Sequence, residues 1–494
     1  MHPTATTSGH AAETPPSSSQ QQNTNPEINE HTTTGSISTI SVNEKTIIEE
    51  RYDNLSNIED ETGSNKDTIN HDTNEKKVVM EDDFEESNYG WLVVLGAFMV
   101  QVTSFGTATS WGVMQTYFKV HRLGMSPSET SQEALNQQVL NLSFVGTMAL
   151  IFTNICGPLA QILTSIWGHR IVLILGTLCV TLGLILAGFA SEIWHLYLTQ
   201  GILFGLGASL MYCTIMSVAP LWFNKRRGLA LGMVASGSGI GGLIIPFIMD
   251  PINNGLGPSW TYRILGFICL ACDLIAVVFV KPRVPVPRQR KKLSDIIKLN
   301  VLKDISFLLF CIGSMVVLFG YFIPYFFLPD YAREIKLDSA QGASLVAVSS
   351  AMNFIGRILA GICADRIGKV NTNIIFTVIG GLSSLLIWTF AKTYGVLMAY
   401  AVVFGLFCGS YFALLSPITA QLLGFERFPT GLSVMLISNV VSVFGPNIAS
   451  AIDNAVVNEP YLTYKIFSGV AYLVGACILF ALKIRLDRNI FAKV

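Results

Sequence analysis

The sequence predicts an all-α integral membrane protein with twelve transmembrane helices in two similar halves. The chain of 494 residues is 51% hydrophobic and only 13% charged, whereas soluble domains have roughly 25% charged residues. From residue 90 onward, runs of about 20 apolar residues, long enough to cross the hydrocarbon core as a helix, alternate with short polar breaks. The second half also repeats features of the first half at an offset of 200 residues.

Residues 1–88 differ in composition from the rest, and we expect a disordered acidic tail there. They hold 5 Lys and Arg against 18 Asp and Glu, whereas the remainder holds 27 against 15. Tyr52 and Phe84 are the only aromatic residues of this segment, so it has too little apolar surface to offset the entropy lost on folding. It does not resemble a secretory signal. Its Lys, Ser and Thr residues make ubiquitin and kinase machinery candidate partners.

The apolar spans are predicted to be helices rather than barrel strands, because they are long and do not alternate strictly. The break at 281–304, rich in proline and basic residues, divides them into halves at 89–280 and 305–485, followed by a short tail at 486–494. The expected spans are 90–118, 138–163, 171–190, 194–222, 228–250, 260–280, 305–329, 340–363, 371–391, 394–423, 429–452 and 462–483.

The basic residues predict the orientation, because Lys and Arg in short loops are retained on the cytoplasmic side. With both termini inside, the internal loops and the C-terminal tail hold 19 Lys and Arg, and the external loops and edges hold 7. We therefore expect both termini in the cytoplasm, and the plasma membrane is the default location.

An offset of 200 residues aligns the two halves. It places Gly168 on Gly368, and the Phe-Gly-Leu run at 204–206 on the same run at 404–406. These matches fall at equivalent places in the two sets of spans, as duplication of a six-helix unit requires. Two pseudo-symmetric halves that rock about a midplane site are typical of secondary transporters.

A motif at the end of span 8 predicts a gate. Asp365 and Arg366 lie among glycines that let helices approach closely. The pair can bond to neighbouring helix ends in one conformation and release them in another, so we predict a latch. In the first half Ser165 stands where Asp365 would be, which removes the acid from that copy. The basic residues before span 5 are assigned to the same gate: Lys225, Arg226 and Arg227.

Two motifs suggest a family. Tyr89, Gly90 and Trp91 enter span 1 after acidic residues, and the run Trp-Phe-Asn-Lys-Arg-Arg-Gly-Leu-Ala-Leu-Gly at 222–232 leads into span 5. With these motifs, residues 88–485 resemble the major facilitator superfamily, and within it the fungal branch of the monocarboxylate transporter family. The resemblance implies alternating access, with a small organic anion, a monocarboxylate in the simplest case, as substrate.

Arg357 is the principal candidate for binding substrate. It lies eight residues before Asp365, roughly 12 Å inside the cytoplasmic edge of span 8, where a charge costs roughly 2.5–3.5 kcal/mol on insertion scales. A guanidinium there would attract an organic anion, and the resemblance implies that this position holds the substrate carboxylate. The alternative role is a brace between helix ends.

Proton coupling is left open by the sequence. Proton-coupled members of the family resemble each other in having a lysine in span 1 and an aspartate one turn before the span 8 arginine. This chain has Asn353 at that turn and no lysine in the corresponding part of span 1, and an amide does not take up a proton near neutral pH. Asn353 is counted with Arg357 among the residues expected to contact substrate. A uniporter, or a symporter coupled through Asp273 in span 6, are the two alternatives. Asp273 could also serve a purely structural hydrogen bond.

Four aromatic residues lie on spans that line the cavity in the superfamily that this chain resembles. They are candidates for contact with a planar substrate, with packing as the alternative role. A carrier of riboflavin or another planar solute is therefore an alternative function, and a non-transporting nutrient sensor is an alternative of another class. These aromatic residues are Trp111, Tyr212, Tyr325 and Tyr411.

Enzymatic activity is not expected. All seven His fall in the tail, in loops or at span edges, which leaves no base for an intramembrane serine protease. The glycine-rich run at 237–242 lies in an apolar span without a preceding strand, so close helix packing explains it better than a nucleotide loop. We expect no cofactor, metal or nucleic acid. The expected partners are a small organic anion, a proton as candidate co-substrate, and the lipid bilayer.

Overall fold

The computed structural model describes residues 87–121, 132–283, 299–455, 461–489 and 492–493, which are helical almost throughout. Eleven helices among these residues are long and apolar enough to cross a membrane, or twelve if the bent pair Asn141–Ile155 and Gly157–Trp167 forms one span. The predicted all-α membrane fold is confirmed, and each predicted span coincides with one of these helices. The predicted tail at 1–88, apart from its last two residues, and most of the predicted linker at 281–304 lie outside the described residues.

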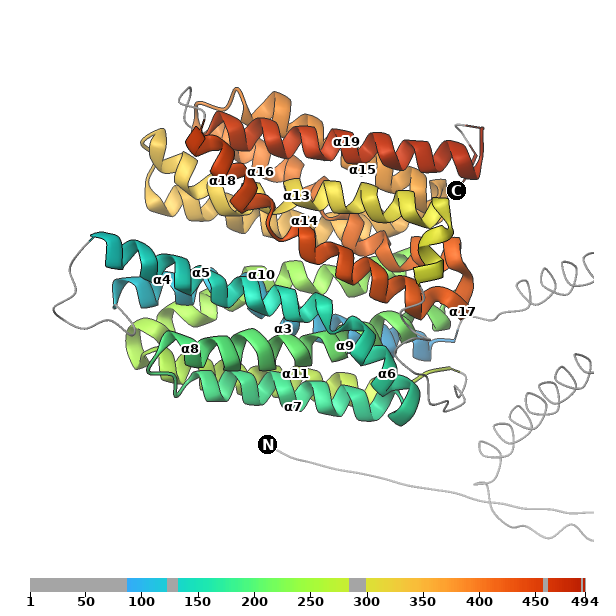
Figure 1. Ribbon diagram of the computed structural model, residues 1–494, viewed down its shortest axis with the longest axis horizontal. Coiled ribbons are helices and arrows are strands. Elements are labelled where there is room, and N and C mark those ends of the chain that lie inside the picture. The colour runs from blue at the N-terminus through green and yellow to red at the C-terminus, as the bar shows by residue number, and fades with distance from the viewer. Residues whose placement is uncertain (1–86, 122–131, 284–298, 456–460, 490–491, 494) are drawn as a thin grey trace, which may run out of the picture. The chain divides into compact units, whose positions relative to one another are not determined.

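The first six spans form one bundle, drawn in blue to yellow-green in Figure 1. Within it, α3 packs against α10 and α11, and α7 packs against α9 and α11. Its elements are α3 (Tyr89–Thr109), α4 (Trp111–Val120), α5 (Gln132–Ile155), α6 (Gly157–Trp167), α7 (His169–Ala187), α8 (Ile193–Leu196), the π-helical turn η1 (Tyr197–Leu203), α9 (Phe204–Val218), the 3₁₀ turn η2 (Ala219–Trp222), α10 (Arg227–Leu256) and α11 (Pro258–Phe279).

The last six spans form the second bundle, drawn in yellow to red. Here α13 packs against α19, and α14 packs against α16. A kink at Gly424 (φ 70°) divides α17 between spans 10 and 11. The elements are η3 (Leu299–Lys303), α13 (Ile305–Glu334), α14 (Ser339–Ile367), α15 (Lys369–Leu382), the π-helical turn η4 (Ser383–Trp388), α16 (Tyr394–Cys408), α17 (Ser410–Ser442), α18 (Gly445–Ala455) and α19 (Leu462–Leu486).

Equivalent residues of the two halves adopt equivalent backbone conformations. Gly168 precedes α7 at φ 86° and Gly368 precedes α15 at φ 103°, a left-handed region that strains residues with a Cβ. The halves also meet at equivalent positions, because Ser416 Oγ donates to the carbonyl oxygen of Met216 at 3.3 Å. These two residues are 200 positions apart, which is the offset that the sequence repeat predicts.

The packing of span 4 on span 2 recurs as the packing of span 10 on span 8. A Cβ at Gly205 would lie 2.8 Å from the carbonyl oxygen of Ala149, and a Cβ at Gly405 would lie 2.5 Å from that of Ser349. Both contacts are too close for any side chain, so glycine is required at both places. The 200-residue repeat is therefore a repeat of helix packing as well as of sequence.

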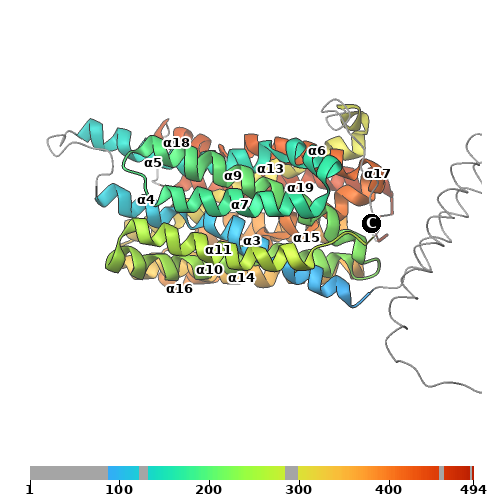
Figure 2. The same cartoon turned by 90° about the horizontal axis from the view of Figure 1, so that it is seen from below.

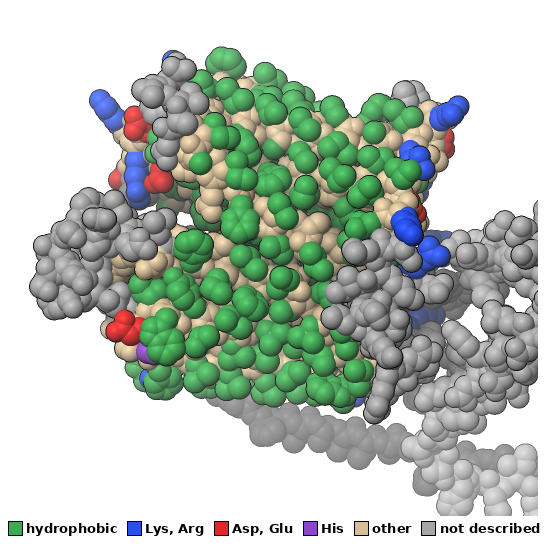
Figure 3. All heavy atoms as spheres, in the orientation of Figure 1, with side chains coloured by type: hydrophobic (Ala, Val, Ile, Leu, Met, Phe, Trp, Pro, Cys, Tyr) green, Lys and Arg blue, Asp and Glu red, His purple; other side chains and the backbone are tan. Residues whose placement is uncertain are grey.

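The outer face of the protein is apolar over its middle. In Figure 3 hydrophobic side chains cover the central part of the visible face, and Lys, Arg, Asp and Glu gather at its two ends. Large side chains at the middle of the spans are strongly exposed, with Leu178 of α7 at 49% and Phe267 of α11 at 59%. Apolar exposure on this scale is suited to lipid rather than to water.

The first described helix begins, and the last one ends, at the same end of the helical bundle. Figures 1 and 2 show the start of α3 and the end of α19 at the right-hand side in both views. An even number of spans requires this arrangement. The assignment of that end to the cytoplasm rests on the distribution of Lys and Arg and stays a prediction.

The glycine-rich run at 237–242 is part of the long helix α10, as the sequence predicts. A Cβ at Gly241 would lie 2.7 Å from the Cα of Gly106 in α3 and closer still to the carbonyl oxygen of Val102. The backbones of α3 and α10 are thus in direct contact. These glycines are explained by helix packing rather than by a nucleotide-binding loop.

We expect Gly241→Ala to lower the melting temperature of the detergent-solubilised protein, because the added methyl group forces α3 and α10 apart and such overpacking costs about 1–3 kcal/mol. Gly112→Ala is the matched control, because a Cβ at Gly112 has no atom within 4 Å. Thermal unfolding followed by intrinsic fluorescence checks both variants. Equal melting temperatures for the two would contradict the contact between α3 and α10.

Candidate functional site

Arg357 of α14 joins the two halves. Its side chain is only 5% exposed. Its Nη1 donates to the carbonyl oxygen of Ala235 at 2.8 Å, and also to the hydroxyl of Ser238. Both acceptors belong to α10 in the first half. In this conformation the predicted substrate-binding arginine connects the two halves through the interior of α10 rather than through a helix end, and its role in binding stays a prediction.

Aromatic side chains of the second half surround the same guanidinium. Arg357 Nη2 donates to the Tyr321 hydroxyl at 3.4 Å, and its Cζ lies 4.8 Å from the centre of the Phe412 ring, within the range of a cation–π interaction. Sequence reasoning missed Tyr321 and Phe412. Tyr321 lies one helical turn before the predicted Tyr325, and Phe412 directly follows the predicted Tyr411. Their positions next to these candidates could have suggested them from the sequence.

Asn353 lies one turn before Arg357 and contacts the same group. Its Nδ2 lies 3.2 Å from the Tyr325 hydroxyl and 3.1 Å from Cys408 Sγ. The structure thus brings Arg357, Asn353 and Tyr325 together, three of the six residues predicted to contact substrate. Cys408 is a further member that the sequence did not suggest. We call these residues, with Tyr321 and Phe412, the Arg357 group.

The other three predicted residues make packing contacts, and one of them touches the Arg357 group, because the ring of Tyr411 meets that of Phe412 edge to face with centres 5.2 Å apart. Tyr212 of α9 meets Phe105 edge to face, with ring centres 5.2 Å apart, and Tyr411 donates to Asn439 Oδ1 at 2.9 Å. Trp111 donates its indole N–H to the carbonyl oxygen of Leu142 in α5 at 3.2 Å. Trp111 is thus fixed between spans 1 and 2 and makes no hydrogen bond to the Arg357 group.

Asp365, the acid of the predicted latch, bonds to the opposite half, and its role as a gate stays a prediction. Its two carboxylate oxygens accept hydrogen bonds from the backbone N–H groups of Gly228 at 2.7 Å and Leu229 at 2.8 Å. These are orphan donors in the first turn of α10, where the helix dipole also favours a negative charge. Asp365 of the second half therefore caps a helix of the first half and joins the two halves at this end.

The basic residues assigned to the gate behave differently from Asp365. Arg227 Nε donates to the carbonyl oxygen of Phe223 at 3.0 Å, within its own loop. The other three are exposed: Lys225, Arg226 and Arg366. The hydrogen bonds between the halves at this end are thus made by Asp365 and the first turn of α10, rather than by these basic side chains.

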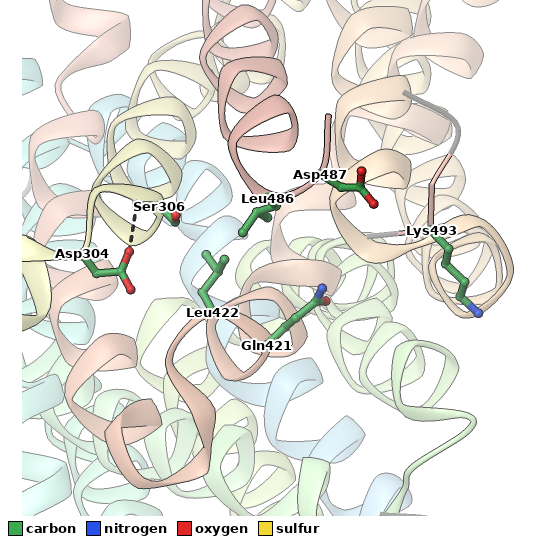
Figure 4. Close-up of a pocket in the computed structure, with 7 residues that line it drawn as sticks. All are labelled: Asp304, Ser306, Gln421, Leu422, Leu486, Asp487 and Lys493. Carbon is green, nitrogen blue, oxygen red and sulfur yellow. Dashed lines mark hydrogen bonds between the residues drawn. The ribbon is translucent and has the colours of Figure 1, made fainter. Parts of the chain in front are cut away.

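The C-terminal residues lie against the latch. Lys493 Nζ donates to the backbone carbonyl oxygen of Asp365 at 2.6 Å, and the Ala492 carbonyl oxygen accepts from Asn371 Nδ2 at 2.8 Å. A pocket of about 390 Å³ adjoins this tail, and Figure 4 shows Asp304 and Asp487 among its lining residues. No member of the Arg357 group lines it, so it is a separate feature from the candidate substrate site.

Asp273 of α11 is completely buried against span 1. Its Oδ1 accepts a hydrogen bond from the Thr103 hydroxyl of α3 at 2.7 Å, and its Oδ2 has no partner among the described residues. This is the structural hydrogen bond that the sequence offered as one role. The prediction that Asp273 carries a proton stays a prediction.

Removal of the latch should be visible in the exchange of two backbone amides. We expect Asp365→Ala to speed hydrogen–deuterium exchange in the first turn of α10 by roughly five- to thirtyfold, because loss of a helix cap costs about 1–2 kcal/mol. Mass spectrometry of a peptide that includes Gly228 and Leu229 measures this rate.

Asp304→Ala is the matched control for this experiment. Asp304 caps α13 of its own half, accepting from the backbone N–H of Ser306 at 2.9 Å, so its removal should speed exchange in α13 and leave α10 unchanged. Unaltered protection of α10 in Asp365→Ala would contradict the latch.

Comparisons with known proteins identify the family. The sequence profile of the Major Facilitator Superfamily matches residues 93–329 and 310–490. The Aspergillus flavus protein named MFS transporter asaE is 31% identical over 397 residues, covering 80% of this chain and 86% of that protein. The agnestins efflux protein AgnL12 of Paecilomyces divaricatus is 28% identical over 403 residues, covering 81% and 89%.

Solved structures share the fold. The proton:xylose symporter XylE, bound to 6-bromo-6-deoxy-D-glucose, superposes with a TM-score of 0.62 at 14% identity, over 82% of this chain and 97% of that one. The sequence resemblance to the superfamily is thus confirmed, whereas the assignment to the monocarboxylate transporters within it stays a prediction. With its helical spans, its internal repeat and the family match, this chain belongs to the major facilitator superfamily and is a multi-pass membrane transporter.

Proposed function

We propose that this protein moves a small organic solute outward across a membrane by alternating access, and that it binds the solute beside Arg357. The carrying observation is a buried guanidinium that joins α14 to α10 and is bordered by aromatic rings. An unneutralised intramembrane cation at the interface of two halves is a functional site by default. The efflux role named for the agnestins relative supports the outward direction.

The solute needs an oxygen acceptor that can compete for Arg357. A monocarboxylate, the substrate that the sequence predicts, fulfils this requirement. Such a ligand would compete with the Ala235 carbonyl and the Ser238 hydroxyl, which now occupy Nη1. Binding would thereby weaken a contact between α10 and α14, and this links occupancy of the site to separation of the halves.

A planar solute, such as riboflavin, is the second candidate. Three aromatic side chains of the Arg357 group favour it, because the centre of the Tyr321 ring lies 5.5 Å from that of Tyr325 and 5.1 Å from that of Phe412. Such rings offer stacking area in addition to the single charge. The relatives described above carry names of transporters, which favours transport over the sensing role.

We assign the latch end to the cytoplasm and the protein to the plasma membrane, as the Lys and Arg distribution predicts. Asp365 holds α10 and α14 together at this end through its bonds to Gly228 and Leu229, and we infer that this contact closes the cytoplasmic side of the path. Release of the latch would then admit solute from inside. Regulation through ubiquitin or kinases concerns residues outside the described part of the chain and stays a prediction.

Proton coupling through Asp273 is part of this proposal. The carboxyl group lies between α11 and α3, with one oxygen bonded to Thr103. A change in its protonation would alter how these two spans pack. A uniporter remains the alternative, because Asn353 replaces the acid that proton-coupled relatives were expected to carry.

We expect Arg357→Ala to abolish export and Arg357→Lys to slow it roughly tenfold. Lysine keeps the charge but lacks the planar fork that reaches Ala235, Ser238 and Tyr321 at once. The measurement is efflux of labelled benzoate and labelled riboflavin from preloaded cells that lack endogenous carriers, with surface abundance determined in parallel.

Lys392→Ala is the control for loss of a positive charge, because Lys392 is exposed in the loop before α16. This variant should export at the rate of the parent protein. Export at the parent rate by Arg357→Ala would assign the arginine a purely bracing role. Failure of the parent protein to move either solute would contradict both proposed substrates.

For Asp273→Asn we expect loss of transport driven by a pH gradient, while exchange at equal pH persists. The amide keeps an oxygen for the Thr103 hydroxyl but cannot carry the proton. Proteoliposome assays with and without an imposed pH gradient measure both activities, and Thr103→Val reports the effect of losing the hydrogen bond alone. If the parent protein transports at the same rate with and without the pH gradient, proton coupling would be contradicted and the protein would be a uniporter.

A further inference from the structure

Span 10 is broken beside the Arg357 group. α16 ends at Cys408 and α17 begins at Ser410, and Gly409 between them has φ −88° and ψ 3°. A Cβ at this position would lie 2.8 Å from Asn353 Oδ1 and 3.0 Å from Arg357 Nε. The missing side chain is thus what lets both groups approach the break. Broken helices near the midplane are where transporters commonly bind their solutes.

Two polar atoms that face this break lack a hydrogen-bond partner among the residues that the structure describes. They are Asn353 Oδ1 and Arg357 Nε, on side chains that are 2% and 5% exposed. Buried polar atoms in native proteins are nearly always paired, and an exception calls for a ligand, a water molecule or a functional reason. Here the two exceptions lie against the same glycine, each about 3 Å from the position that a Cβ of Gly409 would take.

The hydrogen-bonding pattern of the site defines the chemistry of its ligand. Arg357 Nη1 and Nη2 already donate to Ala235 and Tyr321, which leaves the Nε–H as an unused donor. The Nδ2 of Asn353 is directed at the Tyr325 hydroxyl, which leaves Oδ1 as an unused acceptor. A carboxylate offers acceptors only and would place an oxygen against Asn353 Oδ1. A group that offers both an acceptor and a donor satisfies both atoms.

We propose that the Gly409 break selects solutes with a neutral head group in which a carbonyl oxygen adjoins an N–H or O–H, such as an amide, a lactam or a protonated carboxylic acid. The carbonyl oxygen accepts from Arg357 Nε, and the N–H or O–H donates to Asn353 Oδ1. This inference rests on the proposed function, because it takes the Arg357 group to be the solute site. It replaces the expected carboxylate with a neutral group.

Three probes that share one ring test the selection. Benzamide offers an acceptor and a donor, methyl benzoate offers acceptors only, and benzoate at neutral pH is an anion with acceptors only. Equilibrium dialysis of the labelled probes against purified full-length protein in lipid nanodiscs measures their affinities. We expect benzamide to bind at least about tenfold more tightly than the other two, since each of those leaves a buried polar group unpaired.

Gly409→Ala should remove this preference, because the new methyl group displaces Asn353 and Arg357 from the break. Gly395→Ala in the same helix is the matched control, because a Cβ there has no atom within 4 Å. We expect Gly409→Ala to weaken benzamide binding about tenfold and Gly395→Ala to leave it unchanged. Benzamide preference that survives in Gly409→Ala would overturn the inference. If Gly409→Ala does not fold, the three-probe comparison on the unaltered protein decides.

The remaining outcomes separate this inference from the proposed function. Tighter binding of benzoate than of benzamide, lost in Arg357→Ala, would overturn the neutral head group and leave the carrier with a carboxylate site. If the parent protein and Arg357→Ala bind all three probes equally, or bind none of them, both proposals would be overturned. Equal binding of benzamide and methyl benzoate would show that Asn353 Oδ1 takes no part, and would also overturn the inference.

Discussion

The contact between α10 and α14 depends on positions that have no side chain. A Cβ at Gly232 would lie 2.6 Å from the backbone carbonyl oxygen of Arg357, and a Cβ at Gly361 would lie 2.9 Å from the carbonyl carbon of Gly228. Only this close approach brings Asp365 within reach of the first turn of α10 and Arg357 within reach of Ala235. The hydrogen bonds of Asp365 and those of Arg357 to α10 therefore both require the close packing of the two helices at these glycines.

The two halves repeat their packing but differ in how they close. Asp365 caps a helix of the opposite half, whereas the equivalent Ser165 donates to the carbonyl oxygen of Ile162 in its own helix. A charged cap at a helix N-terminus is a stronger and more directional contact than hydroxyl packing. Among the described residues, the copy of the motif at Asp365 thus bonds to the opposite half, whereas the copy at Ser165 bonds within its own helix.

The candidate site combines one permanent charge with rings and neutral hydrogen-bonding groups. Desolvation makes a lone guanidinium unfavourable unless its donors are satisfied, and here α10, Tyr321 and the Phe412 ring satisfy most of them. In the function that we propose, substrate recognition and contact between the halves use this same side chain, so a bound solute would act directly on the contact between α10 and α14.

The sequence by itself determined the spans, their helical character, the duplication and the two intramembrane charges, because these depend on composition and on local spacing along one chain. It also placed Asn353 and Tyr325 with Arg357, since Asn353 lies one turn before the arginine and the superfamily resemblance put Tyr325 on a cavity-lining span. The partners of Arg357 on α10, the role of Gly409 and the packing position of Trp111 were decided by the tertiary structure. Each depends on how closely two helices that are far apart in the sequence pack together. That spacing is set by the volumes of the side chains on both helix surfaces, and it cannot be predicted from the pattern along one segment.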